Sequence, residues 1–279
     1  MTSPRSTIGV PVAQLAAQPG VRLGSWRHTD CRRAVCRWAV SSTHARKLRI
    51  LALHGGGSNV NIMKFQTRAL KHTLGKNVEW DFLSGPRLWE QDSPMPNVML
   101  RLAKGMPFYG WYRVVVHDES ARSHEEKLRD PSVDVEYENV DGSIDAVLKH
   151  IDETGPYDVL LGFSQGCIMI HLLTAILQRR GIAVPWRLSV LVSGMGARDP
   201  RYRSLFESPL RQPAVMIFGQ DDEYYEWGVS SQTKLYRDPL VLEHSEGHRF
   251  PSEQPRAGEI YARIARIVHD LRGADSGSR

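Results

Sequence analysis

The chain has few cysteines and no long apolar run. Its 279 residues include only Cys31, Cys36 and Cys167, which excludes a disulfide framework and is typical of a reducing compartment. Cys31 and Cys36 lack the partners that a zinc site needs, and no set of His, Asp and Glu has metal-ligand spacing, so we expect neither a metal nor a cofactor. No stretch approaches the roughly 18 apolar residues of a membrane span.

Acidic residues are nearly absent from the N-terminal segment. Residues 1–47 contain seven Arg and one Lys against a single acid, Asp30, whereas the remaining chain has 28 basic and 30 acidic residues. Residues 1–46 share the composition of an organelle transit peptide, and equally that of a disordered extension or a wrongly assigned start. Both interpretations stay open, so we expect a cytoplasmic or organellar protein. No aromatic platform or motif for nucleic acid accompanies the charge, which argues against nucleic-acid binding.

From residue 47 onward, apolar strands alternate with helical patterns. This order predicts an α/β fold with a mostly parallel sheet covered on both faces, over a domain of residues 47–272 with a disordered tail at 273–279. The expected strands cover 48–53, 78–83, 186–193 and 213–218, with a last one beginning at Leu240. The expected helices cover 62–74, 139–154 and 260–271.

The most informative stretch is Gly162–Gly166 (GFSQG), which lies between an apolar strand and a helix. Glycines two residues before and after Ser164 remove the Cβ atoms that would collide in a tight turn. A serine in such a turn projects its hydroxyl above the sheet, as a nucleophile does. Cys167, three residues later, is most simply a small buried side chain.

A serine nucleophile needs a base and an acid, which follow in the order Ser, Asp or Glu, His in the α/β-hydrolase arrangement. Only His244 and His248 lie between the last strand and the closing helix. His244 is close to the strand, where side chains pack, so we expect His248 to be the base. For the acid, the run 221–223 (DDE) offers three carboxylates. Asp222 is the preferred acid and Asp221 the alternative, although such runs are often only solvated turns.

The first strand runs into a glycine-rich loop, His54–Gly57 (HGGG). Backbone amides in such a loop form an oxyanion hole together with the amide that follows the nucleophile. We therefore expect Gly56 and Gln165 to donate through their main chains. No Gly-Lys-Ser/Thr follows the loop, so it is not a nucleotide phosphate loop. His54 itself is expected to bond the backbone around the loop.

Taken together, these motifs resemble the FSH-type serine hydrolases, relatives of acyl-protein thioesterases and carboxylesterases in the α/β-hydrolase superfamily. The resemblance covers residues 47–272 and implies Ser164 as nucleophile and His248 as base. The acid of the family lies three residues after a glycine that ends a strand, which here is Asp222. The matching segments are 50–55 with Asn59, 82–86, 155–158, 161–166, 190–194 and 246–251.

The resemblance and the residues predict a serine hydrolase that cleaves a carboxylic ester or thioester of a small to medium acyl group, a small-molecule substrate, through an acyl-enzyme. The alternative is a catalytically silent hydrolase fold that acts as a binding module. An insertion at about 86–138 is expected over the active site, with residues 118–130 as solvated surface. Its aromatic cluster either lines an acyl pocket or lid, or is ordinary packing; it comprises Phe108, Tyr109, Trp111 and Tyr112 beside Met95 and Met106. Oligomeric state stays undetermined by the sequence.

Overall fold

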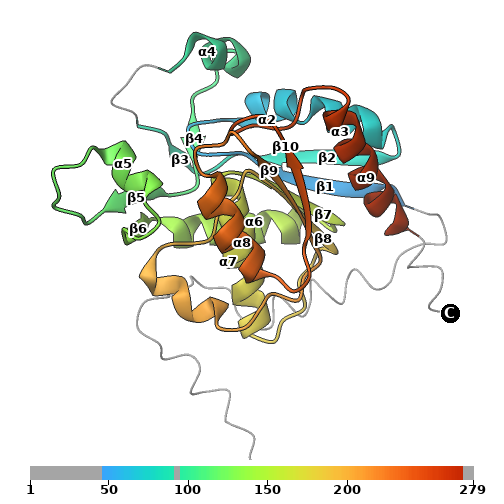
Figure 1. Ribbon diagram of the computed structural model, residues 1–279. Helices are drawn as coiled ribbons and strands as arrows, with labels where there is room; N and C mark the ends of the chain where they lie inside the picture. The colour runs from blue at the N-terminus through green and yellow to red at the C-terminus, as the bar shows by residue number, and fades with distance from the viewer. Residues whose placement is uncertain (1–45, 91–94, 273–279) are drawn as a thin grey trace, which may run out of the picture.

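A parallel sheet forms the centre of the molecule in the computed structural model, which describes residues 46–90 and 95–272 (Figure 1). The transit-peptide prediction falls on residues outside this part, as does the predicted tail. The six strands lie in the order β10-β9-β8-β7-β1-β2, and every neighbouring pair is parallel. Their bounds are β1 (Leu48–Leu53), β2 (Val78–Leu83), β7 (Val159–Phe163), β8 (Leu188–Val192), β9 (Ala214–Gly219) and β10 (Leu240–His244). The α/β prediction is confirmed.

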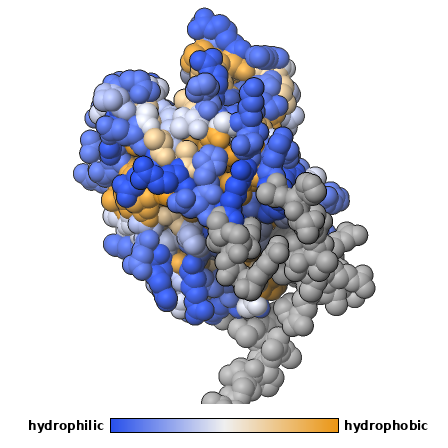
Figure 2. Space-filling view, turned by 90° about the vertical axis from the view of Figure 1, so that its right-hand side faces the viewer, coloured by the Kyte–Doolittle hydropathy of each residue, from blue (hydrophilic) through white to orange (hydrophobic). Residues whose placement is uncertain are grey.

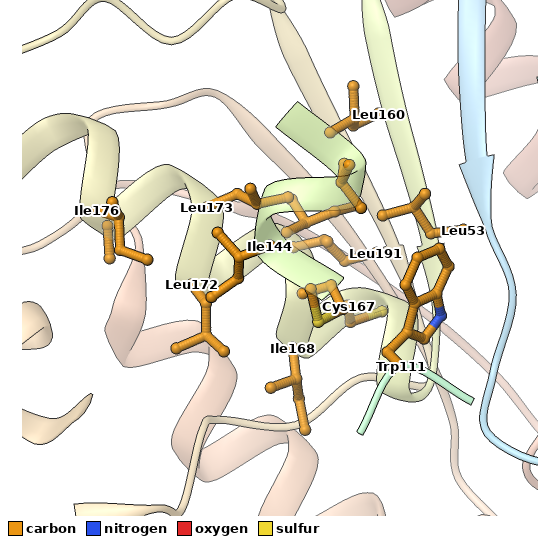
Figure 3. Packing of buried hydrophobic residues seen from close by; sticks show 14 of the residues in the cluster. Leu53, Trp111, Ile144, Leu160, Cys167, Ile168, Leu172, Leu173, Ile176 and Leu191 are labelled. Atoms are coloured by element: carbon orange, nitrogen blue, oxygen red, sulfur yellow. The ribbon is translucent and has the colours of Figure 1, made fainter. Parts of the chain in front are cut away.

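Helices cover both faces of this sheet, as the strand sequences require. All five residues of β7 are buried, because a parallel strand at the centre of a sheet is covered on both sides. One face packs against α2 (Val60–Gln66), α3 (Arg68–Leu74) and α9 (Arg256–Asp270). The other packs against α6 (Val140–Thr154), α7 (Gln165–Arg179) and α8 (Tyr225–Leu235). Figure 3 shows part of this second core, to which Ile144 of α6, Leu172 of α7, and Leu53 and Leu191 of the sheet belong.

The helix predicted at 62–74 is instead two short helices. The break falls at Thr67, which ends α2 and precedes α3. Its buried hydroxyl donates to the carbonyl oxygen of Met63 over 2.7 Å, a back-bond that bends helices. The predicted end of the helix at residue 74 is correct, and Gly75 caps it with φ at 74°.

The insertion forms two antiparallel strand pairs and two short helices. β3 (Arg87–Leu88) pairs with β4 (Tyr109–Gly110), and β5 (Arg113–Val116) pairs with β6 (Val135–Glu138). Between them lie α4 (Asn97–Ala103) and α5 (His124–Arg129). No residue of α5 is buried, in agreement with the predicted solvated stretch. Trp111 and Tyr112 are fully buried in the core, so for these two the interpretation as ordinary packing is correct.

We expect Gly166→Ala to destabilise the protein by about 2–3 kcal/mol. A Cβ at Gly166 would collide with the carbonyl oxygen of Leu53 and lie 3.0 Å from that of His54. Gly142 is the matched control, because a Cβ there meets no atom within 4 Å. Gly142→Ala in α6 should stabilise by roughly 0.5–1 kcal/mol. Urea-induced unfolding measures both, and equal stability of the Gly166 variant and the wild type would contradict the contact.

A second prediction concerns buried histidines. Burial lowers the pKa of His171 to about 3 and that of His54 to about 4, against about 6.5 in an unfolded chain. The unfolded state therefore binds more protons between about pH 6.5 and pH 4, so the free energy of unfolding falls as the pH falls, by up to about 1.4 kcal/mol per unit per histidine. His171→Leu should make this slope shallower in urea titrations at several pH values. The exposed His72, changed to Leu, should leave the slope unaltered; the same slope in both variants would refute the assignment.

Candidate active site

Ser164 lies in the turn that joins β7 to α7, with a backbone that is rare for an L-residue. Its φ is 51° and its ψ is −116°, a conformation that costs on the order of 1–3 kcal/mol and is held by its surroundings. Its amide donates to the carbonyl of Val192 in β8 over 3.1 Å, and its own carbonyl accepts from the amide of Cys167 over 2.9 Å. The strand and the helix thus fix the serine from both sides, and its side chain is half-buried.

The glycines on either side of Ser164 are required by contact. A Cβ at Gly162 would lie 2.7 Å from the amide nitrogen of Cys167. Gly166 rests on the carbonyls at the end of β1, where no Cβ fits. The tight turn predicted from the two glycines is therefore the turn that the structure contains.

His248 and Asp222 are joined by a hydrogen bond. His248 Nδ1 lies 2.7 Å from Asp222 Oδ2, and the Asp222 side chain is 4% exposed against 27% for His248. The other oxygen, Oδ1, accepts from the amide of Tyr224 over 2.9 Å. The histidine ring lies against Phe163, with ring centroids 5.1 Å apart, so it borders the residue before Ser164. No hydrogen bond joins Ser164 Oγ to His248 within residues 46–90 and 95–272.

The three consecutive carboxylates have different surroundings. Asp222 is buried, whereas Asp221 and Glu223 are exposed. Glu223 pairs with Arg129 of α5 over 2.7 Å. The loops after β9 and β10 are held together by backbone bonds from Gln220 to His244 and from Asp221 to Glu246, of 2.7 and 3.3 Å. This contact brings Asp222, and neither neighbour, to His248.

The loop after β1 is held by His54, as the sequence predicts. His54 is fully buried, and its pKa is lowered to about 4 by burial, so the ring is neutral. Nδ1 donates to the carbonyl of Gly55 over 2.7 Å, and Nε2 accepts from the amide of Gly85 over 2.9 Å. The carbonyl of His54 accepts from the indole Nε1 of Trp111 over 2.7 Å. The loop is thereby tied to both β2 and the insertion.

The two predicted oxyanion donors lie against each other. A Cβ at Gly56 would lie 2.7 Å from the Gln165 side chain. Gln165 is the first residue of α7, so its amide has no acceptor within the helix. In the part of the chain that the structure describes, the Gly56 amide donates no hydrogen bond either. Both amides are thus available to a developing negative charge.

Sequence reasoning missed what the Gln165 side chain and Trp89 do. Gln165 Oε1 accepts from the amide of Trp111 over 3.2 Å, and its Nε2 donates to the carbonyl of Tyr112 over 3.4 Å. The half-buried Trp89 lies over two glycines: Cβ atoms at Gly57 and Gly110 would be 3.0 and 2.8 Å from its indole. Trp89 therefore borders the loop that carries Gly56. The sequence signal for Gln165 was a side-chain amide directly after Ser164. Nothing in the sequence indicated that Trp89 lies against the loop.

The competing residues do not fit a reactive role. His244 ends β10 and is buried, as expected for packing. Burial raises the pKa of the Cys167 thiol well above its usual range, so the thiol is inert. Among the described residues, no group of His, Cys, Asp and Glu is arranged to hold a metal ion. No described helix is both long and apolar enough to cross a bilayer.

Comparison with known proteins places the chain in a family. Residues 42–260 match the family model described as serine hydrolase (FSH1). Esterase C25G4.2 of Caenorhabditis elegans is 30% identical over 210 residues, or 74% of this chain and 87% of that protein. Esterase OVCA2 of Homo sapiens is 29% identical over 218 residues, or 76% and 92%. Among solved structures, acyl-protein thioesterase 2 of Zea mays has a TM-score of 0.51 at 20% identity, covering 82% of this chain and 97% of that one, which supports the α/β-hydrolase fold. The chain belongs to the FSH1 serine hydrolase family and is an esterase of the α/β-hydrolase fold.

Proposed function

We propose that Ser164, His248 and Asp222 form the catalytic triad of a carboxylic ester or thioester hydrolase for small to medium acyl groups. The observation that carries the proposal is the 2.7 Å bond between His248 Nδ1 and the buried Asp222. Asp222 accepts a hydrogen bond from the protonated Nδ1 of His248. This bond fixes the tautomer of the ring and leaves Nε2 as the basic nitrogen. The ring borders Phe163, directly before Ser164.

The reaction follows from these roles. Nε2 of His248 takes the Ser164 proton as Oγ attacks the acyl carbonyl, and Asp222 stabilises the imidazolium. The Gly56 and Gln165 amides donate to the oxyanion. When the tetrahedral intermediate collapses, His248 gives its proton to the leaving alcohol or thiol and an acyl-Ser164 ester remains. Water, deprotonated by His248, then attacks this ester, and Ser164 regains its proton as the carboxylic acid leaves.

An ester is the first substrate class to test, because the curated relatives are named esterases. A thioester presents the same carbonyl to the serine and passes through the same acyl-enzyme. Trp89 is a candidate residue for limiting the acyl group, because its indole lies against Gly57 and Gly110 beside the loop that carries Gly56. A series of p-nitrophenyl esters and acyl-CoAs of graded length measures that limit.

Ser164→Ala should abolish both ester hydrolysis and labelling by a fluorophosphonate probe, because only an activated serine reacts with it. The variant should unfold in urea like the wild type, since the side chain is only half-buried. Labelling that persists in the variant would move the nucleophile elsewhere. A wild-type chain that is neither labelled nor active would instead favour the silent binding module.

Asp222→Asn should lower kcat on the order of 10⁴-fold, because an amide does not hold the histidine in the required tautomer or stabilise its cation. Asp221→Asn is the matched control: it makes the same chemical change one residue away, on an exposed side chain, and should cost less than about tenfold. Steady-state kinetics with one soluble ester compares the two. The opposite ranking would make Asp221 the acid.

A further inference from the structure

Exposed hydrophobic side chains lie on elements that neighbour the loop after β1. In residues 46–90 and 95–272, five large hydrophobic side chains are exposed, and four of them lie on α2, β3 and α4: Phe65 (53%), Leu88 (56%), Val98 (52%) and Leu100 (50%). In Figure 1, α4 stands away from the body at the top of the molecule. Figure 2 shows hydrophobic side chains on that projection. Such a concentration marks an interaction site on a soluble domain.

Cations predominate around these side chains, and the exposed Glu90 near Leu88 pairs with Arg87 over 3.7 Å. Residues 60–76 and 95–117 contain seven Lys and Arg and no acid. Lys64, Arg68, Arg101 and Lys104 are all exposed. Among the described residues, no carboxylate pairs with Arg68, Arg101 or Lys104, and Lys64 lies over the ring of Phe82. We call these four cations and the four apolar residues the α2–α4 surface.

This surface is attached to the proposed oxyanion loop. Ser58, two residues after Gly56, exchanges two backbone hydrogen bonds with Tyr109, of 3.1 and 2.7 Å. The Asn61 side chain donates to the carbonyl of Ala103, the last residue of α4, over 3.0 Å. A partner that binds α4 is therefore held close to the proposed oxyanion loop.

We propose that the α2–α4 surface docks the enzyme on a membrane whose headgroups are anionic. Apolar side chains on a short projecting helix enter the boundary between headgroups and acyl chains, while the surrounding cations attract the negative lipids. The apolar side chains of the surface are then matched by the acyl chains, and its cations by the anionic headgroups. The proposal concerns binding alone and does not depend on the triad.

Other occupants match only part of the surface. A second copy of the chain would bring cations against cations. Residues 1–45 contain six Arg and one acid, so they have the same sign as the surface and do not complement it. An acidic protein would account for the cations and leave the exposed apolar side chains of α4 unexplained.

The test is sedimentation of the full chain with phosphatidylcholine vesicles, with and without phosphatidylserine. The wild type and Ser164→Ala should bind only the anionic vesicles, and equally well, which separates docking from catalysis. Arg101→Glu with Lys104→Glu should lower the partition coefficient at least about 20-fold, since each cation near the bilayer contributes roughly fivefold. Arg180→Glu with Arg211→Glu makes the same charge change on exposed residues at the end of α7 and after it, and should have little effect.

The apolar part is tested separately. Val98→Ser with Leu100→Ser should weaken binding about tenfold or more, while Val241→Ser, on the remaining exposed apolar residue, should not. The surface variants and their controls should all retain hydrolysis of a soluble ester, which shows that they fold; the inactive Ser164→Ala is checked instead by its unfolding in urea. Three results would each overturn the proposal: no binding of the wild type to anionic vesicles, equal loss in the matched controls, or a concentration-dependent dimer that the Val98 and Leu100 variant abolishes.

Discussion

The active site depends on the contact between Gly166 and the end of β1. At this point α7 rests directly on the carbonyls of Leu53 and His54, with no room for a Cβ. The same contact places the loop after β1 against the first turn of α7, so that Gly56 meets Gln165. The absence of a side chain at Gly166 therefore fixes two features together: the helix that holds the serine turn, and the position of the loop that carries Gly56. Any residue larger than glycine would separate them, and the positive φ at Ser164 would lose the surroundings that sustain it.

A second glycine has the same effect on the other half of the site. A Cβ at Gly219, the last residue of β9, would collide with the carbonyl oxygens of Glu246 and Gly247. The loops after β9 and β10 are consequently close enough to share backbone hydrogen bonds, and Asp222 reaches His248. Because β9 and β8 lie between β10 and β7, the loop that carries His248 after β10 has to cross two strands to approach the serine turn. Phe163 receives it there, in contact with both His248 and Phe250.

Features fixed by local sequence were predictable, and features fixed by distant contacts were not. The strands and the serine turn follow from apolar runs and glycine spacing, which act over a few residues. The choice among residues 221–223 was open because three adjacent carboxylates have the same local sequence context; burial distinguishes them, and burial is a property of the folded chain. Thr67 breaks a helix whose apolar periodicity is continuous, through a bond of its own hydroxyl. Trp111 and Tyr112 are aromatic residues of the kind that also line pockets, and only the packing shows that they belong to the core. The hydrogen bonds of the Gln165 side chain to the insertion were not predictable either, because they depend on where residues 111 and 112 lie in the folded chain.

The insertion has a buried part, around Trp111, and an exposed helix, α4. The contacts of these two parts determine how a surface that binds α4 is connected to the candidate active site. The buried part is anchored by Trp111, whose indole donates to His54 and whose carbonyl accepts from Ser143 of α6. The exposed helix, α4, is held mainly by contacts with α2, which begins directly after the oxyanion loop, with Asn59 as its N-cap. The described residues thus connect α4 to α2 and to the loop through short hydrogen bonds, from Asn61 to Ala103 and between Ser58 and Tyr109. Docking through the proposed α2–α4 surface would consequently hold the loop that carries Gly56 close to the docked membrane, because α2 begins two residues after Ser58 and contacts α4.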